Sequence, residues 1–199
     1  QMGLVQPVPV FRSSRRPRLA NSLPQSHHET RNAPGRTTLT TISNFTYDEI
    51  DIGQSAPYSR TITQREITLF AAASGDVNPL HLDAEYAATT PFEVPIAHGI
   101  LSASLISAAI ALKLPGPGVV YVGQSLRFMR PVKAGDELTA RIEVTAKRDD
   151  KKFVTLDCEI VNQHGKPVVT GEALVLAPSE KVTIDTPALP DITVGELRP

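Results

Sequence analysis

The sequence is poor in cysteine and aromatic residues, and neither sign of charge dominates it. Cys158 is the only cysteine among 199 residues, so no internal disulfide can form and a reducing compartment is the simpler environment. No apolar run reaches the roughly 18 residues that a membrane-spanning helix needs, so we expect no membrane segment. The formal net charge of -1 provides no positive field that would recruit nucleic acid.

What the chain does contain predicts one folded domain between two tails. Residues 1–40 hold six arginines, five prolines and one acid, so we expect a disordered head. Residues 41–177 have the ordinary periodicity of a globular domain, and the proline-rich residues 178–199 are typical of a tail or linker. We expect a cytoplasmic protein; organelle targeting through the Arg-rich head is the alternative.

Hydrophobic periodicity predicts helices first and strands afterwards. Thr63 and Glu66 have the spacing of a capping box that starts a helix, and Asp83 is placed to cap a second, short helix. Residues 98–113 predict a long, buried helix because they are apolar nearly all round. Alternating segments then predict four antiparallel strands, which are Val119–Val132, Glu137–Ala146, Phe153–Asn162 and Pro167–Leu176.

This order of elements predicts an α+β fold, in which one curved antiparallel sheet wraps the long helix. A sheet of this kind has open edges. Pairing of two copies into a homodimer, or a higher assembly, is the natural way to protect them.

Two stretches carry residues suited to chemistry. Asp76 and His81 are five apart, so one helix would not face them together, but a turn at Asn78-Pro79 brings both to one water molecule. Gly99 begins the long helix, where its N–H has no intrahelical partner and the helix dipole favours negative charge. We expect this N–H to donate a hydrogen bond to a carbonyl oxygen of a ligand that lies over the Asp76–His81 pair.

Residues 64–177 strongly resemble the MaoC-like, (R)-specific enoyl-CoA hydratases of the hot-dog fold. The matching stretches are Phe70 to Asp83, Pro95 to Leu105, and Val120 to Phe128 with Pro131-Val132 and Gly135-Asp136. The resemblance implies a central helix held by a five- or six-stranded sheet, and a homodimer with a continuous sheet. It also implies reversible hydration of a trans-2-enoyl-CoA thioester to the (R)-3-hydroxyacyl-CoA thioester, with no cofactor and no metal.

The same resemblance implies roles for single residues. Asp76 and His81 match the catalytic pair, and Gly99 matches the glycine whose N–H binds the thioester oxygen. Ser107 matches a serine that orients the aspartate, and Asn78 is expected to fix the turn. The tail, residues 177–190, looks like a linker to a phosphate acyltransferase domain, either fused or a partner.

Several alternatives stay open at this stage. Asp76 alone is also a common turn residue, and His81 alone is compatible with a buried, hydrogen-bonded histidine. A metal site would need Asp76, His81 and Asp83. His98 either lines the site or shapes the entry to the helix. Arg127, Arg130 and Lys133 either attract the phosphates of coenzyme A or are ordinary strand-edge charges.

Two rival functions also stay open. A hot-dog acyl-CoA thioesterase would release a free thiol, and a catalytically silent acyl-binding or dimerisation module would bind without turnover. Acyl chain length depends on pocket walls, which we expect near residues 45–60 and 86–96.

Overall fold

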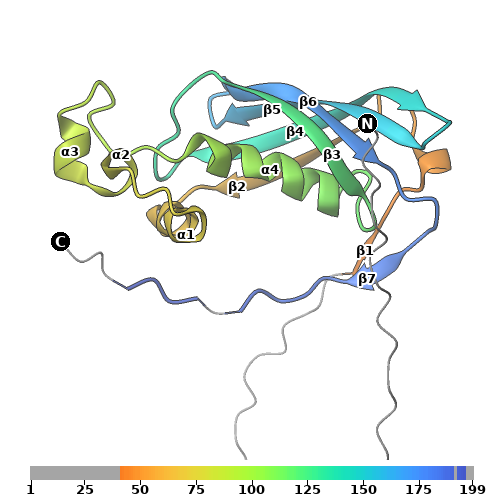
Figure 1. The fold of residues 1–199 in the computed structure, drawn as a ribbon, viewed down its shortest axis with the longest axis horizontal. Helices are drawn as coiled ribbons and strands as arrows, with labels where there is room; N and C mark the ends of the chain where they lie inside the picture. The colour runs from red at the N-terminus through yellow and green to blue at the C-terminus, as the bar shows by residue number, and fades with distance from the viewer. Residues whose placement is uncertain (1–40, 191, 196–199) are drawn as a thin grey trace, which may run out of the picture. The chain divides into compact units, whose positions relative to one another are not determined.

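The computed structural model describes residues 41–190 and 192–195, so the predicted head lies outside the described residues. Among the described residues, no helix is both long and apolar enough to cross a membrane. The architecture is the predicted α+β arrangement, in which one central helix packs on the concave face of a curved antiparallel sheet (Figure 1).

Helix α1 (Gln64–Ser74) begins at the capping box that its sequence predicts. The capping box consists of two reciprocal hydrogen bonds. The Thr63 side chain accepts from the Glu66 backbone N–H, and the Glu66 side chain accepts from the Thr63 backbone N–H. Gly75 ends the helix in the left-handed conformation at φ 77°, and its N–H donates to the Ala71 carbonyl. This stop delivers the chain directly to Asp76.

The turn predicted at Asn78-Pro79 also starts a short helix. Helix α2 (Pro79–Leu82) begins at the proline. The first helical position needs no N–H, so proline is tolerated there, and the Asn78 side chain caps the helix by accepting from the Leu80 N–H. Asp83 then caps α3 (Ala84–Ala88) by accepting from two backbone N–H groups, as predicted.

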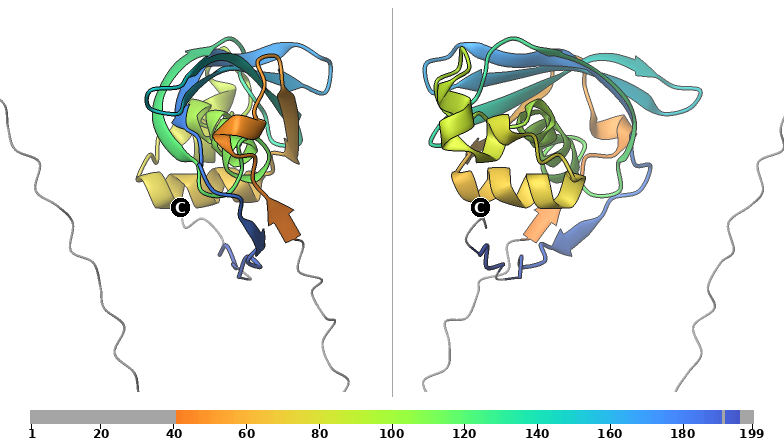
Figure 2. Two further views of the ribbon diagram at one scale, coloured as in Figure 1. Left: turned by 90° about the vertical axis from the view of Figure 1, so that its right-hand side faces the viewer. Right: turned by 60° about the vertical axis from the view of Figure 1, so that its left-hand side comes forward.

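The long helix α4 (Gly99–Leu112) is wrapped by five antiparallel strands in the order β2-β4-β5-β6-β3 (Figure 2). Their bounds are β2 (Ser55–Thr61), β3 (Val120–Phe128), β4 (Glu137–Arg148), β5 (Phe153–Asn162) and β6 (Pro167–Leu176). The last two bounds match the prediction. Strand β3 ends four residues earlier than predicted, before Pro131, which cannot donate to a ladder.

The core lies between α4 and the inner face of the sheet. On β5, Val154, Leu156, Cys158 and Ile160 alternate inward and are buried, as their period of two predicted. Burial raises the pKa of the Cys158 thiol to about 12, which fits inert packing and not a reactive cysteine. Strand β3, at the edge of the sheet, is instead exposed along most of its length.

Part of the predicted tail belongs to the folded structure. Strand β7 (Thr183–Asp185) pairs antiparallel with β1 (Thr41–Ser43), and the two form a separate small sheet. A short 3-10 helix, η1 (Tyr47–Glu49), follows β1. Neither short strand has a periodic pattern, so sequence reasoning left them in the tail and at the domain boundary.

Candidate active site

Asp76 lies in the short turn between α1 and α2. Its backbone N–H donates to the Ser74 hydroxyl at 3.2 Å, and its carboxylate accepts from the Asn78 N–H at 3.3 Å. These two local bonds give the turn its shape. They leave the rest of the carboxylate, which is on an exposed residue, free to face a ligand.

His81 approaches the same turn from α2 and is buried. Its Nδ1 lies 2.7 Å from the Ile96 carbonyl oxygen, which can only accept, so Nδ1 carries the hydrogen. In the neutral ring Nε2 therefore holds a lone pair. The Ile96 N–H donates back to the Leu80 carbonyl, so the loop before α4 and helix α2 hold the ring from two sides.

His98 precedes the first turn of α4 and is also buried. Its Nε2 donates to the backbone carbonyl of Asp76 at 3.0 Å, and its ring lies 3.8 Å from the His81 ring, centroid to centroid. The Phe70 ring contacts it at 4.9 Å. His98 therefore ties the Asp76 turn, α1 and α2 to the start of α4, which is the structural role considered from the sequence.

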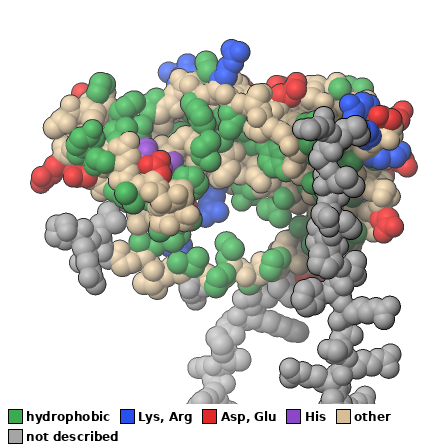
Figure 3. Space-filling view, in the orientation of Figure 1, with side chains coloured by type: hydrophobic (Ala, Val, Ile, Leu, Met, Phe, Trp, Pro, Cys, Tyr) green, Lys and Arg blue, Asp and Glu red, His purple; other side chains and the backbone are tan. Residues whose placement is uncertain are grey.

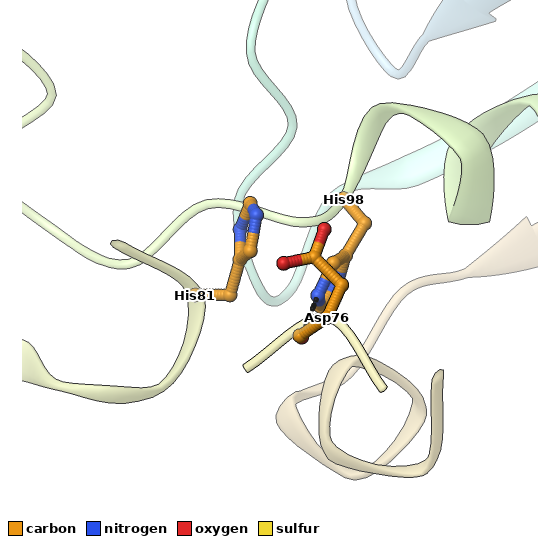
Figure 4. Close-up of side chains that lie close together, drawn as sticks. All are labelled: Asp76, His81 and His98. Atoms are coloured by element: carbon orange, nitrogen blue, oxygen red, sulfur yellow. Dashed lines mark hydrogen bonds between the residues drawn. The ribbon is translucent and has the colours of Figure 1, made fainter. Parts of the chain in front are cut away.

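The three side chains converge, as Figure 4 shows. One ligand-type atom from each of Asp76, His81 and His98 lies within 4.8 Å of the others. Histidine side chains lie beside an acidic group at the surface near α2 (Figure 3). The structure thus brings together the predicted pair, and His98 joins it.

Asp83 takes no part in this group. Its carboxylate accepts from the N–H groups of Glu85 and Tyr86 and caps α3. The metal site weighed from the sequence therefore lacks its third ligand. The types in the observed group, one carboxylate and two imidazoles, are nevertheless types that bind metals. The expectation of no metal stays a prediction.

A cavity of about 290 Å³ opens beside these residues. His81, Gly99 and Ser102 contribute its polar groups on the helix side. Its other walls are mostly apolar, and Phe92, from the region where we expected a pocket wall, is one of them. A Cβ added to Gly99 would lie 2.9 Å from the Phe128 ring, so glycine keeps this wall open.

Two buried polar atoms at this site have no hydrogen-bond partner, and they are the two found among the described residues. They are the His98 Nδ1 and the Ser102 Oγ. Ser102 was not singled out from the sequence. The available signal was its position three residues after Gly99, a polar side chain on a helix face that is otherwise apolar.

Ser107 and the three basic residues are not gathered into the group. Ser107 is exposed on α4, eight residues or about 12 Å along the helix from Gly99, and within residues 41–190 no hydrogen bond joins it to Asp76. Arg130 does line the cavity, but a guanidinium N–H donates to the Pro167 carbonyl. The roles proposed for Ser107 and the basic residues stay predictions.

The comparisons with known proteins show the family of the chain. The family model for the MaoC like domain matches residues 47–164, which include Asp76, His81, His98 and Gly99. The chain belongs to the MaoC-like domain family. Its fold is accordingly the hot-dog fold that the resemblance implied.

Relatives within the MaoC-like family are close in sequence. The (R)-specific enoyl-CoA hydratase of Aeromonas caviae is 52% identical over 129 residues, which are 65% of this chain and 96% of that protein. That of Rhodospirillum rubrum is 47% identical over 135 residues, or 67% and 92% of the two chains. A solved R-hydratase from Pseudomonas aeruginosa is 52% identical at a TM-score of 0.76, covering 78% of this chain and all of that one.

Proposed function

We propose that this MaoC-like protein is an (R)-specific enoyl-CoA hydratase. It adds water reversibly to a trans-2-enoyl-CoA and forms the (R)-3-hydroxyacyl-CoA. The observation that carries the proposal is the meeting of an acid–base pair and a helix end: the Asp76 carboxylate lies beside His81, and His81 lines one cavity together with Gly99 at the N-terminal end of α4. Two (R)-specific hydratases that match nearly along their whole length support it.

The Asp76–His81 pair is suited to activating water. A carboxylate and a neutral ring nitrogen, held within a few ångströms, can together accept hydrogen bonds from one water molecule. As the water oxygen bonds to the β-carbon, its proton passes to the pair. The pair then supplies a proton to the α-carbon, so that one water is added across the double bond. No cofactor takes part in this sequence.

The start of α4 is suited to the charge that develops on the thioester oxygen. Gly99 is the first residue of the helix, so its N–H has no intrahelical partner. The cavity wall at this point is backbone, because there is no side chain to separate it from a ligand. A carbonyl oxygen bound here would gain a hydrogen bond and the favourable end of the helix dipole as negative charge accumulates.

The proposal is tested by replacing Asp76 with Asn and measuring hydration of crotonyl-CoA by the loss of its conjugated absorbance. We expect the rate to fall by at least about 1,000-fold, since the substitution removes a proton acceptor. Asp83→Asn is the matched control. Asn is as good a helix cap as Asp, so this variant is expected to keep full activity.

The rival functions are outcomes of the same assay. Release of free coenzyme A from a saturated acyl-CoA would indicate a thioesterase, and binding of acyl-CoA without turnover would indicate a silent module. Unchanged hydration by the Asp76→Asn variant would contradict the catalytic role assigned to this carboxylate.

We infer further that two copies form a homodimer through β3. This edge strand exposes Val120, Val122 and Phe128 to about half of their full extent, and its outer backbone groups have no neighbouring strand within the described sheet. Antiparallel pairing of two β3 strands would satisfy these groups and join both sheets. We expect light scattering to give twice the chain mass for the parent protein. We expect the Val122→Glu variant to shift toward the monomer. A monomeric parent protein would contradict this inference.

The remaining expectations about location and partners stay predictions. They are the cytoplasmic location, with organelle targeting as its alternative, and the link to a phosphate acyltransferase through the tail. Mass spectrometry of the native protein, isolated with its partners, would test both.

A further inference from the structure

Ser102 is a buried hydroxyl that the proposed reaction does not yet use. It is 2% exposed, lines the same cavity as Gly99 and His81, and its Oγ has no hydrogen-bond partner. Buried polar groups are nearly always paired, and an unpaired one costs about 1–3 kcal/mol. A group left unpaired at a cavity wall is therefore placed to meet a ligand.

Three other hydroxyls on helices of the described chain are satisfied locally. Thr68, Ser74 and Ser104 each donate to a backbone carbonyl one turn earlier, at 2.9, 2.7 and 2.6 Å. Ser102 does not make this bond, although its own N–H donates to the His98 carbonyl in the usual helical way. Its hydroxyl is thus free where those three hydroxyls are not.

The Ser102 side chain leans toward the N-terminal end of α4. Side chains on an α-helix lean toward the N-terminus, and residues three apart lie on one face. The Ser102 hydroxyl therefore lies on the side of α4 where the Gly99 N–H ends the helix. The neighbouring His98 Nδ1 cannot act as a donor in the neutral ring, because Nε2 carries the hydrogen that bonds the Asp76 carbonyl.

We propose that the Ser102 hydroxyl is a second donor to the thioester carbonyl oxygen, beside the Gly99 N–H. This inference rests on the proposed function, since it assigns a residue to the same reaction. Two donors that converge from one helix end would hold the carbonyl in a fixed orientation. They would also stabilise the oxygen more strongly as it gains charge than in the ground state.

The test separates a contact to the carbonyl from a structural effect. Ser102→Ala is compared with Ser104→Ala, which removes a hydroxyl from the same helix outside this cavity. Two unreactive ligands are used: butyryl-CoA, which has the carbonyl, and S-butyl-CoA, a thioether that lacks it. We expect Ser102→Ala to weaken butyryl-CoA about 10-fold, to leave S-butyl-CoA unchanged, and to lower kcat/KM for crotonyl-CoA roughly 100-fold.

Each result has one meaning. Equal weakening of both ligands, or unchanged kcat/KM in Ser102→Ala, would overturn the proposal, and so would the same loss in Ser104→Ala. A different result would overturn the proposed function and keep Ser102 as a carbonyl-binding residue. In it, the wild-type protein never hydrates crotonyl-CoA, but it binds butyryl-CoA more tightly than the Ser102→Ala variant does.

Discussion

Buried polar groups at the two ends of helix α4 differ in whether their hydrogen bonds are satisfied. At the C-terminal end, Asn44 is 1% exposed and its side chain makes three hydrogen bonds, to the Pro117 and Glu180 carbonyls and from the Val182 N–H. At the N-terminal end, His98 and Ser102 are equally buried, and each keeps a polar atom without a partner.

This difference distinguishes polar groups that stabilise the fold from polar groups that are available to a ligand. Asn44 joins the loop after α4 to the chain before β7, so its hydrogen bonds hold the domain together. The unpaired atoms at the other end make no hydrogen bond that stabilises the fold, and Ser102 lines a cavity. Loss of the Asn44 amide should therefore reduce stability, and loss of the Ser102 hydroxyl should reduce activity.

Among changes at the two ends of α4, the largest effect is expected from Gly99→Ala. The new Cβ would lie 2.9 Å from the Phe128 ring and would stand where the carbonyl approaches the backbone. We expect hydration of crotonyl-CoA to fall about 100- to 1,000-fold, the usual cost of losing an oxyanion donor. The close contact is with a side-chain ring and not with backbone, so the melting temperature should change little.

A double variant identifies the cause of that loss. In Gly99→Ala with Phe128→Ala, the ring no longer competes for the space. Persistent inactivity would show that the methyl group itself blocks the carbonyl, whereas recovery would assign the loss to the displaced ring. Full activity in the single variant would remove Gly99 from the proposed oxyanion site.

Asn44→Ala is the opposite experiment, and its effect on activity should be small. The substitution leaves two carbonyls and one N–H of partly buried hydrogen bonds without their partner. We expect the free energy of unfolding to fall by about 3 kcal/mol and the melting temperature to fall by about 10 °C. Ser102→Ala should not lower it, because that hydroxyl has no bond to lose. Denaturant titrations and kcat per folded molecule check both statements, and a stability loss in Ser102→Ala would contradict the comparison.

Local sequence signals predicted the elements that need only local causes. The capping box at Thr63 and the cap at Asp83 both lie where the sequence indicates. Alternation fixed β5 and β6 at both ends, because a strand with one buried face must repeat every two residues.

Features that depend on distant parts of the chain were missed. The pairing of β1 with β7 joins residues about 140 positions apart through strands of three residues, too short to show a period. Ser102 in isolation is one more small residue in a helix of Ala, Ser, Ile and Leu. Only the packing of Phe128 and the loop before α4 around it creates the cavity that gives its hydroxyl a use.

The smallest effect is expected from a chelator, and it tests the N-terminal end most directly. His81 and His98 each donate one ring N–H to a backbone carbonyl, a pattern found both in metal sites and in histidines that are simply held in place. The proposed chemistry needs only proton transfer and hydrogen bonds, so dialysis against EDTA should leave the rate of hydration unchanged. Elemental analysis of the active protein should find less than one metal ion per chain. Loss of activity that Zn²⁺ restores would instead make Asp76, His81 and His98 ligands of a metal ion, and their polar atoms would then be partnered in the working enzyme.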